Sequence, residues 1–119
     1  MESLDNSQNV IKQFLNYPDE FWHYIHKRII YVDSTIFGNE IFYNTLMKFD
    51  QNNCLQDIKV FIPYIIDMDT AKINVHELKH AYDLYLRLGQ VIDEDTESFE
   101  EDAIALEHNF VKKYHHLNI

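Results

Sequence analysis

The sequence has little glycine, proline or cysteine: its 119 residues include two glycines, two prolines and one cysteine. Because glycine and proline form no cluster, there is no candidate linker, and we expect a single domain over residues 1–119. That length is sufficient to bury a hydrophobic core. One cysteine cannot form an internal disulfide bond, so Cys54 is expected to be a free, small apolar side chain.

Basic residues are also scarce, and long hydrophobic runs are absent. Ten Lys and Arg against twenty Asp and Glu give a formal net charge of -10 at pH 7. This charge repels polyanions, and no Lys or Arg cluster alternates with aromatic residues, so neither nucleic acid nor an anionic membrane is an expected partner. No signal peptide or membrane-spanning run is evident, which predicts a cytoplasmic protein.

Hydrophobic spacing in the first half of the chain predicts helices and one strand. Apolar residues recur at three- and four-residue intervals in residues 5–16 and 18–28, so a helix is expected in each. A third helix is expected after Asn39, which could be its N-cap. Its inward-facing residues would be Ile41, Phe42, Thr45, Leu46 and Phe49. Pro18 is expected at the first position of the second helix. The β-branched and aromatic run Ile29–Asp33 is typical of a strand.

The second half predicts a strand followed by two helices, which makes the fold class α+β with a small sheet of two or three strands. Residues 57–67, DIKVFIPYIID, are strand-like, and Pro63 lacks a backbone donor, so an edge position is expected for this strand. A helix over residues 74–89 would end at Gly89, a residue suited to a left-handed cap. The last helix is expected to begin at Ser98, which forms a capping-box pattern with Glu101.

The helix over residues 74–89, NVHELKHAYDLYLRLG, contains the motif H-E-x-x-H. His76 and His80 are four residues apart and share one helix face, so they could bind one ion. Glu77 lies in the otherwise apolar arc, where an unpaired carboxylate is costly to bury. A metal held by the two histidines would account for it, since Glu77 could then act as general base on a water at that metal.

A catalytic zinc ion needs a third protein ligand. In metzincins the third ligand is the last histidine of the motif H-E-x-x-H-x-x-G-x-x-H. This chain has Leu86 at that position, so it is not expected to be a metzincin. On the last helix, Glu100 and Glu107 fall in the apolar arc, whereas Glu101 faces water. Glu100 precedes the small Ala103 by one turn, where two helices could approach closely, so Glu100 is the predicted third ligand. Glu107, two turns further, is expected to support a ligand or to form a buried pair.

Together these residues resemble the active-site pattern of the gluzincins, the zinc metallopeptidases that include thermolysin. HELKHAYD is similar to their active-site helix, and the interval of nineteen residues between His80 and Glu100, residues 81–99, is the one found in thermolysin-like enzymes. The resemblance covers residues 75–114. It departs from the family at Ile104, where thermolysin-like enzymes have an aspartate that orients a histidine.

The resemblance implies a minimal zincin-like domain with its sheet packed on the H-E-x-x-H helix. It also implies one Zn²⁺ bound by His76, His80 and Glu100, and hydrolysis of a peptide or protein substrate with Glu77 as the base. The strand at residues 57–67, if at an edge, could pair with the substrate.

Two alternatives stay open. One is a catalytically silent zincin-like module that binds a partner protein through its acidic surface; the other is a metal hydrolase that does not cleave peptides. The presence of Glu77 favours an enzyme, whereas the short chain leaves little material for specificity pockets.

Overall fold

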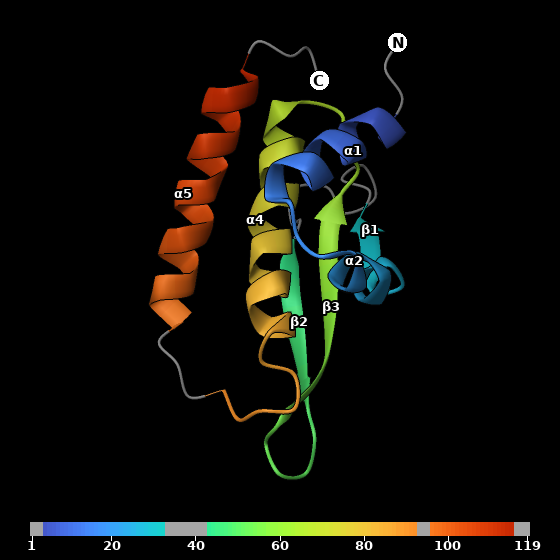
Figure 1. Cartoon of the computed structure of the whole chain (residues 1–119), viewed down its shortest axis with the longest axis vertical. Coiled ribbons are helices and arrows are strands. Elements are labelled where there is room, and N and C mark those ends of the chain that lie inside the picture. Colours follow the sequence, from blue (N-terminus) through green and yellow to red (C-terminus); the bar gives the residue numbers. More distant parts are fainter. Residues whose placement is uncertain (1–3, 33–42, 93–95, 116–119) are drawn as a thin grey trace.

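The computed structural model describes residues 4–32, 43–92 and 96–115, and these residues form an α+β fold (Figure 1). The helices are α1 (Leu4–Leu15), α2 (Asp19–His26), α4 (Met68–Tyr85) and α5 (Thr96–Tyr114), and the strands are β1 (Ile29–Val32), β2 (Asn44–Phe49) and β3 (Leu55–Pro63). The predicted fold class and the predicted small sheet are therefore confirmed. None of the described helices has the length and apolar character needed to cross a membrane.

The three strands form a mixed sheet in the order β1-β3-β2. β1 runs parallel to β3, with Ile29 opposite Val60, and β2 runs antiparallel to it, with Thr45 opposite the same Val60. The predicted edge position for the strand around Pro63 is thus wrong, because β3 is the central strand. Pro63 is its last residue, where the missing N–H interrupts no bond inside the ladder.

β2 replaces part of a predicted helix. The prediction of a helix after Asn39 is wrong for residues 44–49, which pair with β3; Asn39, Ile41 and Phe42 lie outside the described residues. Residues 50–54 join β2 to β3, and the Asp50 carboxylate accepts hydrogen bonds from the backbone N–H groups of Asn52 and Cys54 within this connection. Pairing with β3 supplies backbone hydrogen bonds that outweigh the helical spacing of the apolar residues.

The first two helices agree with the prediction, and α4 and α5 begin earlier than expected. Pro18 is the N-cap of α2 and not its first helical residue. α4 begins at Met68, because Asp67 and Thr70 form a capping box in which the Asp67 carboxylate accepts the Thr70 N–H at 2.8 Å. α5 begins at Thr96, so Ser98 lies inside its first turn, and the predicted capping box with Glu101 is wrong.

The end of α4 differs slightly from the prediction as well. The helix stops at Tyr85, and the chain turns through Gly89, whose φ of 84° is in the left-handed region that a residue without a Cβ adopts easily. The Gly89 N–H then donates to the Leu55 carbonyl at 2.8 Å. This bond ties the exit from α4 to the start of β3.

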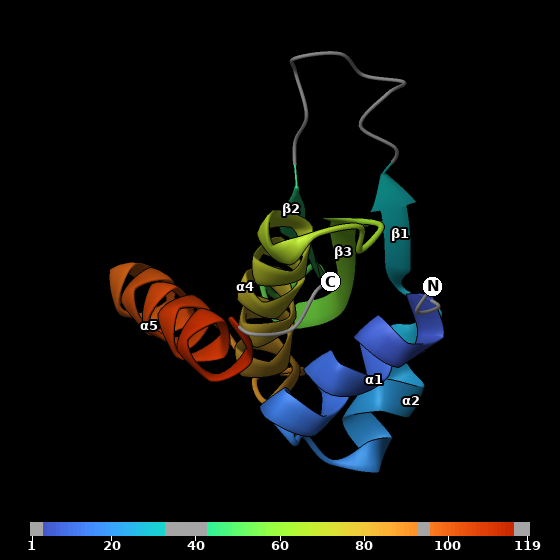
Figure 2. The same cartoon turned by 90° about the horizontal axis from the view of Figure 1, so that it is seen from above.

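α4 is the central helix, and the core lies on both sides of it. Figures 1 and 2 show α5 alongside α4, with α1 and α2 on the other side. The buried residues form two clusters around it. One contains Phe21, Ile25, Leu55, Ile58, Val60, Ile62, Ala81 and Leu84, and the other contains Ile11, Leu15, Ile65, Ala71, Val75, Leu78 and Phe110. The buried Asn74 amide donates to the Pro63 carbonyl at 3.0 Å, which fixes α4 against the end of β3.

Candidate metal centre

Three predicted ligands lie together between α4 and α5. His76 Nε2 is 3.0 Å from His80 Nε2 and 3.0 Å from Glu100 Oε1, and His80 Nε2 is 2.9 Å from Glu100 Oε2. One ligand atom from each of the three side chains lies within 4.8 Å of the others. The residues that the sequence selects are thus close enough to bind one ion, while metal binding itself remains a prediction.

Helical register and helix packing bring these side chains together. Residues 76 and 80 share a face of α4 because they are four apart. Ala103 on α5 is fully buried, so its small side chain lets the two helices approach near the site, as expected. The histidine side chains are mostly buried, at 14% and 18% exposure. Glu100 is 52% exposed, so its predicted position in the apolar, inward-facing arc of the last helix is wrong: it lies at the edge of the contact between the two helices. The site is therefore accessible to solvent on the side of Glu100.

The donor set fits zinc. Two imidazole nitrogens and a carboxylate are common ligands of Zn²⁺, and bond lengths of about 2.0–2.2 Å place the ligand atoms of a tetrahedral site roughly 3.3 Å apart. The three close contacts are not all explained by hydrogen bonds, because each of the two nitrogens carries at most one proton. If His76 Nε2 and His80 Nε2 both carry a proton, their two N–H groups face each other at 3.0 Å. One cation among the three groups removes this conflict.

Glu107 lies behind the first histidine. Its Oε2 is 3.3 Å from His76 Nδ1, and its side chain is 19% exposed. This contact agrees with the expectation that Glu107 supports a ligand or forms a buried pair. A carboxylate at Nδ1 keeps the proton on that nitrogen and leaves the Nε2 lone pair facing the site. Glu107 thus contacts the ring of His76, whereas the resemblance to the gluzincins left this kind of support without a residue at Ile104.

Replacement of Glu107 tests this support. We expect Glu107→Gln to weaken zinc binding by about 10- to 100-fold, the usual effect of losing a hydrogen-bonded partner behind a ligand. Competition with a zinc chelator measures the affinity. Glu101→Gln is the matched control, because Glu101 is exposed on the same helix. Equal affinities of the two variants would contradict the role of Glu107.

The Glu77 carboxyl is buried next to the three candidate ligands and contacts Thr45 of β2. Glu77 is 8% exposed, and the Thr45 hydroxyl lies 2.9 Å from its Oε1 and 3.1 Å from its backbone carbonyl oxygen. Burial raises the pKa of Glu77, and the Glu100 charge acts in the same direction; the Thr45 hydrogen bond and the two histidines oppose the shift. A raised pKa makes the carboxylate a better proton acceptor.

Thr45, Tyr43 and Ile73 were not placed at the site by the sequence analysis. A cleft of about 320 Å³ is lined by Tyr43, Ile73, His76, Glu77, Glu100, Ile104 and Glu107. Thr45 was expected to face inward on a helix, which gave no reason to place it near Glu77. The available signal was the polar stretch at residues 50–53 between two apolar runs, which is typical of a β-hairpin.

No protein-family model, curated protein or solved structure matches this chain. What the chain has is an α+β fold with a His-His-Glu group that could hold a metal ion.

Proposed function

We propose that the protein is a zinc-dependent peptidase of the gluzincin type, built on a minimal zincin-like fold. One observation carries the proposal: His76, His80 and Glu100 converge on one point while the buried Glu77 carboxylate lies beside them. A metal site with structural purpose alone would have no need of a buried base at that position.

Each residue then has a defined role. His76, His80 and Glu100 would hold Zn²⁺, which would supply Lewis acidity toward the scissile carbonyl and the attacking water. Glu77 would accept the proton of the attacking water and deliver it to the leaving amine. Thr45 would keep the Glu77 carboxylate in position through its hydrogen bond.

The position of β2 supports a peptide substrate. In the order β1-β3-β2, β2 is an edge strand, and among the described residues it pairs with β3 alone. Thr45 on this strand contacts Glu77, so the edge runs beside the candidate site. An extended peptide could add to β2 by backbone hydrogen bonds and reach the metal. β3, which was expected to have this role, is central and unsuited to it.

A digestion experiment tests the proposal. Zinc-loaded protein is incubated with a mixed peptide library, and new termini are identified by mass spectrometry. We expect cleavage that a chelator abolishes and added zinc restores. A fully zinc-loaded protein that cleaves no peptide would instead favour the silent interaction module.

Zinc binding is also expected to stabilise the fold. A ligand that binds only the native state adds about 2.7 kcal/mol at a free concentration of 100 times Kd, which for a chain of this size is a rise in Tm of roughly 10 °C. Thermal unfolding with added zinc and with chelator measures the shift. His80→Ala should show no such response. A Tm that is indifferent to both zinc and chelator would contradict the predicted metal site.

A further inference from the structure

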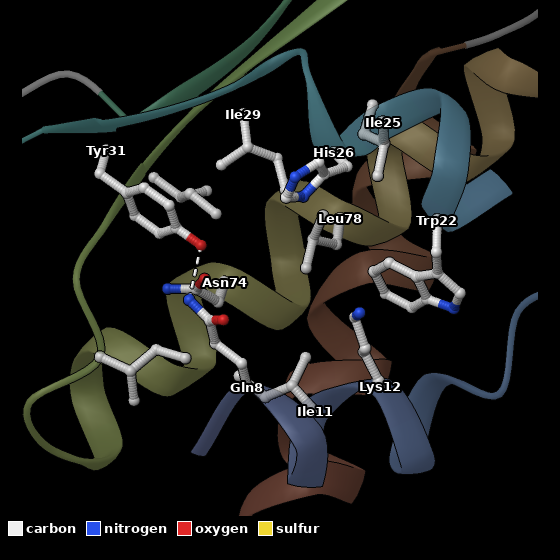
Figure 3. Close-up of a pocket in the computed structure, with 12 residues that line it drawn as sticks. Gln8, Ile11, Lys12, Trp22, Ile25, His26, Ile29, Tyr31, Asn74 and Leu78 are labelled. Atoms are coloured by element: carbon white, nitrogen blue, oxygen red, sulfur yellow. Dashed lines mark hydrogen bonds between the residues drawn. The ribbon is translucent and has the colours of Figure 1, made fainter. Parts of the chain in front are cut away.

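A second cavity lies on the other side of α4, between α1, α2, β1 and α4 (Figure 3). α4 contributes Asn74 and Leu78 to it, and none of its lining residues lines the cleft at the candidate metal centre. The two sites are therefore separate, and the inference below does not depend on the proposed peptidase activity.

The inner wall of this cavity is aliphatic. Ile11, Ile62, Ile65 and Leu78 line it, and all four are at most 4% exposed. Its volume is about 70 Å³. An apolar cavity of about 150 Å³ accommodates benzene. The present cavity is smaller, so it suits a short branched aliphatic group better than an aromatic ring.

The polar residues of the cavity favour an anion. The chain has twice as many acidic as basic residues, yet no acidic residue lines the cavity, while Lys12 and His26 both do. Figure 3 shows the Lys12 side chain pointing between Trp22 and Leu78, and its Nζ is 5.4 Å from the centre of the Trp22 ring. Within the described part of the chain, Lys12 has no carboxylate partner.

The exposed Lys12 ammonium, which has no carboxylate partner among the described residues, is complementary at this apolar cavity to a ligand with a negative end and an apolar end. Gln8 and Tyr31 also line the cavity, and the Gln8 amide donates to the Tyr31 hydroxyl at 2.7 Å, which adds polar groups to its wall. A carboxylate near Lys12 would form a charge-assisted hydrogen bond, while the aliphatic group would fill the space between the isoleucines and Leu78.

We propose that this cavity binds a small branched aliphatic carboxylate, with the carboxylate at Lys12 and the aliphatic group against Leu78. The same chemistry is present in a free short-chain acid such as isovalerate and in the C-terminal residue of a peptide that ends in leucine or valine.

The single tryptophan of the chain, Trp22, lines the cavity and reports on it directly. Isovalerate is titrated into the full chain while Trp22 fluorescence is followed, and calorimetry gives the affinity independently of emission. Isovaleramide is the uncharged control ligand. We expect saturable binding of isovalerate and at least tenfold weaker binding of the amide, because the charge-assisted bond is lost.

Two lysine variants make the test specific. Lys12→Gln should weaken isovalerate binding by about tenfold. Lys113→Gln should leave it unchanged; Lys113 is a matched control because its Nζ also lies over a ring, 5.5 Å from the centre of Tyr114, but away from the cavity. Lys12→Gln should retain the zinc affinity of the unchanged chain, so failure of the peptidase proposal and failure of this one are distinguishable.

Peptides with a free or an amidated C-terminal leucine distinguish the two sources of the carboxylate. Tighter binding of the free-carboxylate peptide than of isovalerate supports a peptide C-terminus, and the reverse supports a free acid. Equal affinity for isovalerate and isovaleramide would overturn the proposal. So would equal effects of the two lysine variants, or no calorimetric binding of any of these ligands.

Discussion

Glu100→Ala is expected to release zinc and to abolish peptide hydrolysis, while Glu101→Ala leaves both unchanged. The two carboxylates are adjacent in α5, but only Glu100 reaches the histidines, at 3.0 and 2.9 Å. Loss of Glu100 leaves two protein ligands, fewer than the three of a catalytic zinc site. The affinity should therefore fall by more than the 10- to 100-fold expected of Glu107→Gln.

Neither replacement is expected to disturb the fold, because both side chains are exposed. Glu100 is 52% exposed, and Glu101 is exposed as well. Since α5 begins at Thr96, Ser98 is not its N-cap, and the stability cost of Glu101→Ala at an exposed position should stay within about 0.5 kcal/mol. Chelator competition ranks the affinities, and thermal unfolding of the metal-free variants checks the fold.

Other orders of zinc affinity among the glutamate variants would contradict the assignment of Glu100 as the third ligand. If Glu101→Ala released zinc and Glu100→Ala did not, α5 would present another face to α4. If Glu107→Ala released it most strongly, Glu107 would be the third ligand, and the interval of residues 81–99 would be coincidence.

Glu77→Gln is expected to keep zinc and to lower kcat/KM by roughly 10²- to 10⁴-fold, the range of general-base catalysis. Glutamine has the shape of glutamate, and its amide oxygen can still accept the hydrogen bond that Thr45 donates to Oε1. A neutral side chain is also no harder to bury at this position, where Glu77 is 8% exposed.

Metal content and turnover must be measured on the same samples. Glu101→Gln removes the same charge at an exposed position and should retain full activity. If Glu77→Gln lost its zinc together with its activity, Glu77 would have a structural role. Undiminished turnover would exclude it as the base.

Much of the candidate site could be predicted because its residues lie on two helices, α4 and α5, whose periodicity is visible in the sequence. The placement of His76 and His80 on one face follows from their spacing in any α-helix, and Glu77 was conspicuous as a carboxylate among apolar residues. Ala103 likewise marked the place where α5 could approach α4, and it is fully buried. Each of these inferences needed only local periodicity.

The sheet could not be predicted in the same way. Residues 44–49 have apolar residues at helical intervals, yet they form β2, because hydrogen bonds to β3 are available only once both segments are adjacent. Pro63 indicated an edge, but β3 is flanked by β1 and β2, since a proline at the last position of a strand interrupts nothing. Strand order depends on partners that lie elsewhere in the chain.

The sequence by itself therefore determined the α+β class, the three candidate ligands and the candidate base, since helical spacing and the cost of burying a carboxylate are local properties. Only the tertiary structure decided that Glu107 contacts His76 Nδ1, that Thr45 holds Glu77 and that β2 is the edge beside the site. These contacts depend on the rotation of α5 against α4 and on the order of the strands. Both are set by packing between segments distant in sequence, which no local pattern encodes.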